Sequence, residues 1–230
     1  PMAWKQRKSG NASPELLFTR PDESVEIDLH WSFVPNYYPF PLDPAPLWRR
    51  ATTVNVSGRK VPAFSPEDLL LVLCVHGAKH LWNRLRWICD IAKLVQTGLD
   101  WDLALQHARE QRCERTLLVG IAMAHEVLGA PLPADILARI HGVPSNAVAV
   151  AALKHRLITT ETIQPTGWEF CRYVALFAPN WRVKLRFWLG VVAVPKEADA
   201  AAVKLPGFLG APLRLARLAL KHAGTLARGR

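Results

Sequence analysis

An unbroken alternation of apolar and polar residues over positions 25–31, Val-Glu-Ile-Asp-Leu-His-Trp, is the clearest pattern in the chain. Successive side chains of a β-strand point to opposite sides, so the alternation predicts a strand over residues 25–34 with one buried side and one polar side. The apolar side, which we expect to face a core, consists of Val25, Ile27, Leu29 and Trp31. The polar side consists of Glu26, Asp28 and His30.

The polar side of this predicted strand carries candidate metal ligands. Acidic residues are poor strand formers, so two of them in one short strand need an explanation. Glu26 and Asp28 lie about 6–7 Å apart along the strand, close enough for both carboxylates to approach one divalent cation. His30 could contact the metal, a phosphate group or a structural hydrogen-bond partner. The alternative is a polar side that is solvated and binds nothing.

The first 64 residues are predicted to be strand-rich, with irregular stretches around the strands. Residues 1–24 show no clear period and are expected to be irregular. Five prolines between positions 35 and 46 predict a stiff, extended connection without regular structure. Residues 52–56 and 60–64 are predicted to form a hairpin that turns at Ser57-Gly58.

After residue 64 the pattern changes to a helical period. Ser65 is a good helix N-cap, Pro66 suits the first helical position, and the two acids that follow complement the helix N-terminus. The predicted helices cover residues 65–80, 84–97, 101–111, 114–128, 134–141, 146–158, 167–178, 181–193 and 210–226. We therefore predict an α+β fold, with a small, partial sheet in residues 1–64 and a mostly helical domain in residues 65–230.

The composition is that of a globular protein. Of the 230 residues, 50% are hydrophobic and 21% are charged, and no apolar run approaches the ~18 residues of a membrane-spanning helix. The four cysteines are Cys74, Cys89, Cys113 and Cys171. They form no Cys-x-x-Cys pair, which argues against a zinc site and favours buried, reduced thiols. Reduced thiols and the lack of a secretory signal predict a cytoplasmic location.

Positive charge concentrates towards the C-terminus. The net charge is +10, and residues 180–230 contain ten Lys and Arg against two acids, a local charge of +8. Such a segment attracts polyanions, so we expect an anionic lipid surface or nucleic acid as its partner. Arg214, Arg217 and Lys221 share one side of a predicted amphipathic helix, which could instead pack on the domain and leave its charges in water.

A second group of candidate site residues lies at the end of the first predicted helix. It consists of His76, Lys79, His80, Arg84 and Arg86, which we call the basic cluster. His76 and His80 are one helical turn apart, as in zinc hydrolases, but the glutamate that acts as the base in those enzymes is absent. Lys79 and the two arginines are suited to binding phosphate. The alternatives are that the histidines line the core and that the basic side chains are only solvated.

Several motifs together resemble a known family. The motifs are Glu26-Ile27-Asp28-Leu29-His30-Trp31, Trp48-Arg49-Arg50-Ala51, Ser65-Pro66-Glu67-Asp68-Leu69-Leu70, His76-Gly77-Ala78-Lys79-His80, Arg84-Leu85-Arg86-Trp87-Ile88-Cys89-Asp90-Ile91-Ala92 and Leu205-Pro206. In this order they resemble a family of uncharacterised bacterial nucleotidyltransferases with a polymerase-β-like fold. The resemblance covers most of residues 25–225, and it is loose after about residue 130.

The resemblance implies an activity, a metal and roles for particular residues. Such enzymes transfer a nucleoside monophosphate from an NTP to an acceptor hydroxyl or phosphate with Mg²⁺, so the expected partners are an NTP and an unknown acceptor. Asp28 would be a catalytic carboxylate and, with Glu26, a metal ligand, while the basic cluster would bind the nucleotide. Asp90 resembles a nucleotide-binding residue of toxin-type nucleotidyltransferases, although a structural ion pair with a neighbouring cation is the alternative.

One part of the family pattern is missing from this chain. Related enzymes carry a Gly-Ser turn and an Asp-x-Asp strand, which supply the first two metal-binding carboxylates, before the strand that corresponds to residues 25–31. The 24 residues before Val25 contain neither motif. We therefore expect a truncated or degenerate form with little or no activity of its own, because one carboxylate seldom fixes two metal ions.

Two other functions are compatible with the same residues. The first is a non-enzymatic module that binds nucleotide, nucleic acid or a protein partner through the helical domain and the basic C-terminal segment. The second is a metal-dependent hydrolase that uses Glu26, Asp28 and the pair His76 and His80.

Overall fold

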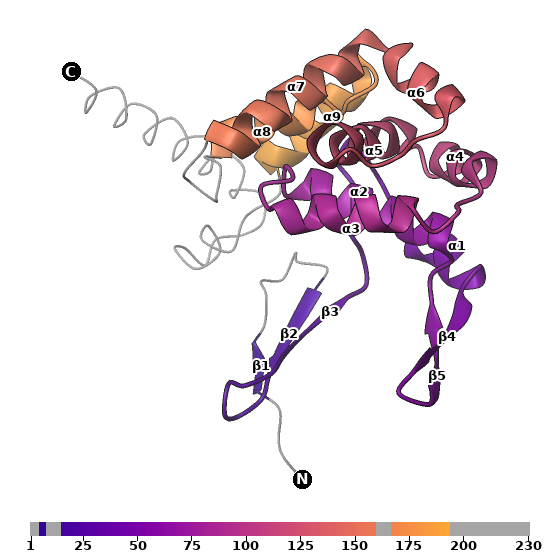
Figure 1. Ribbon diagram of the computed structural model, residues 1–230. Helices are drawn as coiled ribbons and strands as arrows, with labels where there is room; N and C mark the ends of the chain where they lie inside the picture. Colours follow the sequence, from indigo (N-terminus) through magenta and orange to yellow (C-terminus); the bar gives the residue numbers. More distant parts are fainter. Residues whose placement is uncertain (1–4, 8–14, 160–166, 194–230) are drawn as a thin grey trace. The chain divides into compact units, whose positions relative to one another are not determined.

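The computed structural model describes residues 5–7, 15–159 and 167–193, and it confirms the α+β class (Figure 1). The chain divides into two compact units, each of which is described by itself. Unit 1 comprises Pro1–Trp31 and Leu185–Arg230, and unit 2 comprises Ser32–Lys184. These boundaries differ from the division after residue 64, which stays a prediction about domains.

Unit 1 contains a three-stranded antiparallel sheet in the order β1-β2-β3. The strands are β1 (Lys5–Arg7), β2 (Glu15–Thr19) and β3 (Glu26–His30). The predicted strand is confirmed as β3 over Glu26–His30, but residues 31–34, which were predicted to continue it, are not part of a strand. The expectation that residues 1–24 are irregular was wrong, because β1 and β2 lie there. Strand β2 pairs with β3 so that Asp28 lies opposite Leu17. Strand β2 was not predicted because its sequence, Glu-Leu-Leu-Phe-Thr, does not alternate between apolar and polar residues.

The apolar side of β3 is exposed, so the expectation that it faces a core was also wrong. The exposed fractions are 39% for Val25, 47% for Ile27, 52% for Leu29 and 54% for Trp31. Alternation determines which side chains share a side of a strand, but not whether another element covers that side. All five residues of β3 are exposed.

Unit 2 begins with a short helix and a hairpin. Helix α1 spans Pro44–Arg49, and its first turn accommodates two of the five prolines because the first N–H groups of a helix need no helical partner. The predicted hairpin is confirmed as β4 (Thr52–Val56) and β5 (Arg59–Ala63). At its turn Gly58 has a φ of +81°, which glycine adopts without strain, and Asn55 Oδ1 accepts a hydrogen bond from the Gly58 N–H.

The rest of unit 2 is helical, and helix α5 lies at its centre. The helices after the hairpin are α2 (Pro66–Lys79), α3 (Leu85–Val95), α4 (Trp101–Glu110), α5 (Glu114–Leu128), α6 (Ala134–His141), α7 (Pro144–Thr159), α8 (Gly167–Ala175) and α9 (Trp181–Ala193), with the unit boundary falling inside α9. These helices confirm all the predicted ones except 210–226, which lies outside the described residues. Helix α5 packs against α2, α3 and α7, and nine consecutive residues from Thr116 to Ala124 are buried (Figure 1).

Close packing between α2 and α5 depends on small residues. A Cβ at Gly120 would lie 2.5 Å from Sγ of Cys74, so the two helices can approach only where α5 has no side chain. Cys74, Cys113 and Cys171 are buried as expected, and burial raises the pKa of the Cys113 thiol to about 12. Cys89 is exposed on α3, which corrects the prediction for that cysteine.

No single helix among the described residues has both the length and the apolar character needed to cross a membrane. Helices α6 and α7 meet that test only when they are taken together, and they are bent by 91° at the break between them.

Candidate functional site

The polar side of β3 holds one close pair of titratable groups. His30 Nε2 lies 2.9 Å from Asp28 Oδ2, and the exposed fractions of the two side chains are 33% and 51%. Glu26 is also exposed on this strand. No group of three or more His, Cys, Asp or Glu side chains among the described residues is arranged to hold a metal ion. The donors that this part of the chain supplies therefore do not by themselves form a magnesium centre.

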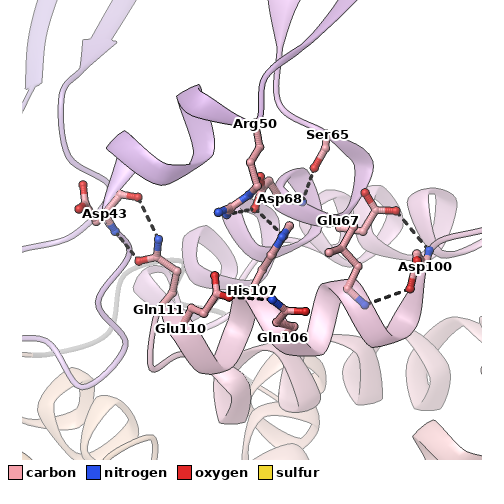
Figure 2. A network of polar contacts seen from close by, with 11 residues as sticks. Asp43, Arg50, Ser65, Glu67, Asp68, Asp100, Gln106, His107, Glu110 and Gln111 are labelled. Carbon is pink, nitrogen blue, oxygen red and sulfur yellow. Dashed lines mark hydrogen bonds and ion pairs between the residues drawn. The ribbon is translucent and has the colours of Figure 1, made fainter.

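A buried ion pair lies at the other polar region, the first turn of α2 (Figure 2). The Asp68 side chain is fully buried and accepts two hydrogen bonds from Arg50, at 2.9 Å from Nε and 2.7 Å from Nη2. These bonds raise the pKa of the Arg50 guanidinium. His107 Nδ1 approaches Asp68 Oδ1 to 3.1 Å, without the alignment of a hydrogen bond. Such a paired, enclosed carboxylate fixes the position of two elements rather than binding a ligand.

Surface hydrogen bonds extend this network in Figure 2. Ser65 Oγ accepts from the Asp68 N–H, which confirms the predicted N-cap, and Glu67 Oε1 accepts from the Asp100 N–H. Gln111 and Asp43 exchange two hydrogen bonds between side chain and backbone. The network therefore ties the segment containing α1 to α2 and α4. Nothing in the sequence alone predicts this network, although the motifs around Arg50 and Asp68 meet in it.

The last turn of α2 ends in a tight reversal that brings α3 back alongside it. The N–H of Leu81 donates to the Ala78 carbonyl at 3.2 Å, and the N–H of Trp82 donates to the Gly77 carbonyl at 2.8 Å. These two bonds form a Schellman motif, in which Leu81 takes the left-handed conformation (φ 56°) that glycine usually supplies. Trp82 is also left-handed (φ 44°).

A buried tryptophan holds this reversal in place. Trp82 is fully buried and packs against Phe177, with ring centroids 5.8 Å apart. A Cβ at Gly77 would overlap Nε1 of the Trp82 indole, so the insertion of the ring requires glycine at that position. The Gly in the motif His76-Gly-Ala-Lys-His80 is thus explained by packing, and the packed turn determines where α3 starts.

The turn gathers the basic cluster around a second tryptophan, Trp87. The centroid of the Trp87 ring lies 4.8 Å from that of His80 and 5.3 Å from that of His76. The centroids of the two histidine rings are 4.7 Å apart. The guanidinium carbons of Arg84 and Arg86 each lie 5.8 Å from the centre of the same ring. Trp87 itself is only 8% exposed, so it serves as a platform beneath the basic side chains.

The electrostatics of the basic cluster suit an anion. Burial, together with the positive charges of the other cluster members, lowers the pKa of His80 to about 4. Arg84 and Arg86 lie at the start of α3, where the helix dipole is positive. The first turn of α3 contains no acid, and the side chain of its N-cap residue, Arg84, makes no capping hydrogen bond. Cations in the first turn of a helix are unfavourable for the fold alone, and an anion bound there would relieve this.

Asp90 lies on the exposed side of α3, one turn after Arg86. Because its charge is exposed to water, Asp90 does not need the structural ion pair that was the alternative to nucleotide binding. Its side chain borders a shallow pocket of about 370 Å³. The other residues that line the pocket are Leu69, Leu73, Lys93, Leu94 and Thr97. The pocket runs between α2 and α3, the same two helices that carry the basic cluster.

The predicted site residues thus fall into two groups. The structure brings the basic cluster together in unit 2 and places Asp90 in the adjoining groove. Glu26, Asp28 and His30 belong to unit 1. The histidines of the cluster do not line the core: His76 is exposed and His80 is partly exposed, both against Trp87.

Comparison with known proteins identifies the family. A family model described as "Uncharacterised nucleotidyltransferase" matches residues 2–129, which include β3, the buried ion pair and the basic cluster. No curated protein and no solved structure gives a significant match. Because the matched region covers more than half of the 230 residues, the chain belongs to this uncharacterised nucleotidyltransferase family.

Proposed function

We propose that this chain takes part in transferring a nucleoside monophosphate from an NTP to an acceptor, and that the basic cluster binds the NTP polyphosphate. The observation that carries the proposal is the position of Arg84 and Arg86 in the acid-free first turn of α3, beside His76 and His80 on the Trp87 platform. A triphosphate would supply the negative charge that this arrangement needs, and its oxygens match the forked donors of arginine.

The groove beside the cluster is the proposed place for the nucleoside. Leu69, Leu73 and Leu94 give it an apolar lining suited to a base, and Asp90 supplies a carboxylate that can accept hydrogen bonds from ribose hydroxyls. Lys79, on the last turn of α2, adds a compact positive charge near the phosphates.

Asp28 and Glu26, on the same side of β3, are the proposed metal ligands. Mg²⁺ in this family would neutralise phosphate charge and align the reacting groups. The described residues do not complete such a centre around Asp28. The candidate acceptors are sugar phosphates, polysaccharide intermediates, RNA and proteins.

A calorimetric titration with ATP, GTP, CTP and UTP, with and without Mg²⁺, tests the proposal. We expect at least one NTP to bind, and to bind more tightly than inorganic triphosphate if the groove holds the nucleoside. Asp90→Asn should reduce that difference and leave the affinity for inorganic triphosphate unchanged. Binding that depends on Mg²⁺ and loses this dependence in Asp28→Asn would support Asp28 as a ligand. Failure of all four NTPs to bind would contradict the proposal.

A non-catalytic nucleotide-binding module is the second candidate. The observation in its favour is that the described carboxylates and histidines form no metal-binding group, whereas the basic cluster is assembled. The same titration, followed by an assay for pyrophosphate release, separates the two. NTP binding without pyrophosphate release from any acceptor tested would favour the module.

A further inference from the structure

Helix α9 exposes an apolar stripe to solvent. Trp181 is 69% exposed, Leu185 is 49% exposed and Leu189 is 59% exposed. These residues are spaced i, i+4 and i+8, so they follow one another along a single side of the helix. Phe187, which is fully buried, lies on the opposite side. Helix α9 therefore has two apolar sides, of which the core needs only one.

Basic residues border the stripe on both flanks. On a helix with 100° between successive residues, Arg182 and Arg186 lie on one flank of the stripe and Lys184 lies on the other. All three are exposed, and the sequence of α9 contains no Asp or Glu. The Arg182 guanidinium also lies 5.5 Å from the Trp181 ring centre, so the charge and the aromatic ring form one unit at the start of the helix.

We propose that α9 is a membrane-surface helix, which lies in the plane of an anionic bilayer with Trp181, Leu185 and Leu189 inserted among the lipids. An exposed apolar stripe with basic flanks is the arrangement by which interfacial helices bind anionic lipid. Tryptophan is suited to the headgroup region because its ring is apolar and its N–H is polar. The helix has 13 residues, far fewer than the ~20 needed to span the hydrocarbon core, so it would lie along the surface.

The chemistry of the stripe favours lipid over nucleic acid. A nucleic-acid surface uses basic side chains with aromatic rings on which bases stack, and two exposed leucines contribute nothing to either contact. Acyl chains, in contrast, receive leucine side chains readily. The excess of basic residues from position 180 onward also favours an anionic surface, because each Lys or Arg near such a surface strengthens binding. This proposal does not depend on the proposed function.

Flotation of the full 230-residue chain with lipid vesicles tests the proposal. The vesicles are phosphatidylcholine alone, or equal parts of phosphatidylcholine and phosphatidylglycerol. We expect binding to the anionic vesicles, weaker binding to the neutral ones, and a loss of binding as salt rises, because salt screens the basic flanks. Leu185→Ser/Leu189→Ser should lower the partition coefficient by about tenfold or more.

A matched control keeps the test specific. Val148→Ser/Ile158→Ser changes two apolar residues of α7 that are 60% and 79% exposed, and it should bind vesicles like the wild type. Arg182→Glu/Lys184→Glu should abolish the preference for anionic vesicles. Circular dichroism and thermal melting would verify that each variant is folded, which we expect because every substituted position is exposed.

Three outcomes would overturn the proposal. The wild-type chain fails to float with anionic vesicles, or the Leu185/Leu189 variant floats as well as the wild type. Alternatively, the wild-type chain is a dimer in solution that the Leu185/Leu189 variant dissociates, which would mean that a second copy covers the stripe.

Discussion

At its first turn helix α2 buries Asp68 between Arg50 and His107, whereas at its last turn it carries the basic cluster. The first arrangement pairs opposite charges inside the fold, so the Asp68 carboxylate already has its counter-charge and hydrogen-bond donors within the protein. The second gathers like charges on a partly exposed platform, which costs stability unless something outside the fold compensates. One helix thus shows how to separate a structural charge cluster from a candidate binding site.

The surroundings of the two ends reinforce this contrast. At the first turn the acids sit where the helix dipole favours them. At the α2–α3 turn, left-handed Leu81 and Trp82 place Arg84 and Arg86 where the dipole of α3 opposes them. Functional sites often retain backbone strain and unfavourable charges that the fold alone would not favour, and both occur at this turn.

Removing the negative charge at the first turn should have the largest effect on stability. We expect Asp68→Asn to lower the free energy of unfolding by about 3 kcal/mol, because it leaves the Arg50 guanidinium without its counter-charge. Urea denaturation measures this loss. Glu67→Gln is the matched control: its side chain is on the surface and can still accept from the Asp100 N–H, so the change should stay within about 0.5 kcal/mol. Equal effects of the two variants would remove the contrast between paired and surface charges.

Filling the space beside Trp82 should have the next largest effect. Gly77→Ala places a methyl group against the indole, and we expect a loss of about 1–3 kcal/mol through overpacking. Because the displaced ring holds the α2–α3 turn, NTP affinity should fall as well. Gly142→Ala, where the nearest atom to a Cβ is a backbone oxygen at 3.2 Å on α6, is the control and should leave NTP affinity unchanged. Unchanged stability in Gly77→Ala would contradict the role given to Trp82.

The pH dependence of stability should report His80. Its pKa is near 4 in the folded chain and near 6.5 when unfolded, so the unfolded state binds a proton first as the pH falls. Stability should therefore be complete above about pH 6.5 and decline towards pH 4. His80→Gln should flatten this decline, whereas His141→Gln, which alters an exposed histidine at the end of α6, should not. If the free energy of unfolding declines with falling pH equally in the wild type and in His80→Gln, the burial of the His80 ring is contradicted.

Adding an acid to the first turn of α3 should have the smallest effect on stability, and it should stabilise the fold where Asp68→Asn and Gly77→Ala destabilise it. Arg86→Glu replaces a cation by an anion at the positive end of the helix, and we expect a gain of about 0.5 kcal/mol. The same variant should bind NTP much more weakly. A loss of stability would indicate that Arg86 serves the fold rather than a ligand.

Local signals in the sequence predicted the helices of unit 2 well. Helices α5 and α6 have the predicted limits, and the predicted cap Ser65 accepts the expected hydrogen bond from the backbone, as Asp100 does at the start of α4. Caps and helical periodicity depend only on neighbouring residues, so one sequence contains the information needed to find them.

Contacts between distant residues could not be predicted in this way. Arg50 and Asp68 meet only because the β4–β5 hairpin returns the chain to the start of α2, and His107 arrives from α4. The basic cluster was found from its spacing, but its assembly around Trp87 depends on the buried Trp82. The short strand β2 was missed because its apolar residues are consecutive, and a single strand pattern could not reveal that β3 is exposed on both sides.

The affinity of an NTP for the variant Arg84→Ala/Arg86→Ala is the most direct test of the polyphosphate site. Calorimetry at one fixed ionic strength would compare this variant with the wild type and with Arg59→Ala/Arg139→Ala, which removes two exposed arginines elsewhere on unit 2. We predict that NTP affinity falls by about tenfold or more in Arg84→Ala/Arg86→Ala and stays at the wild-type value in the control, while both variants remain folded. An equal affinity for all three proteins, or equal losses in the two variants, would contradict it.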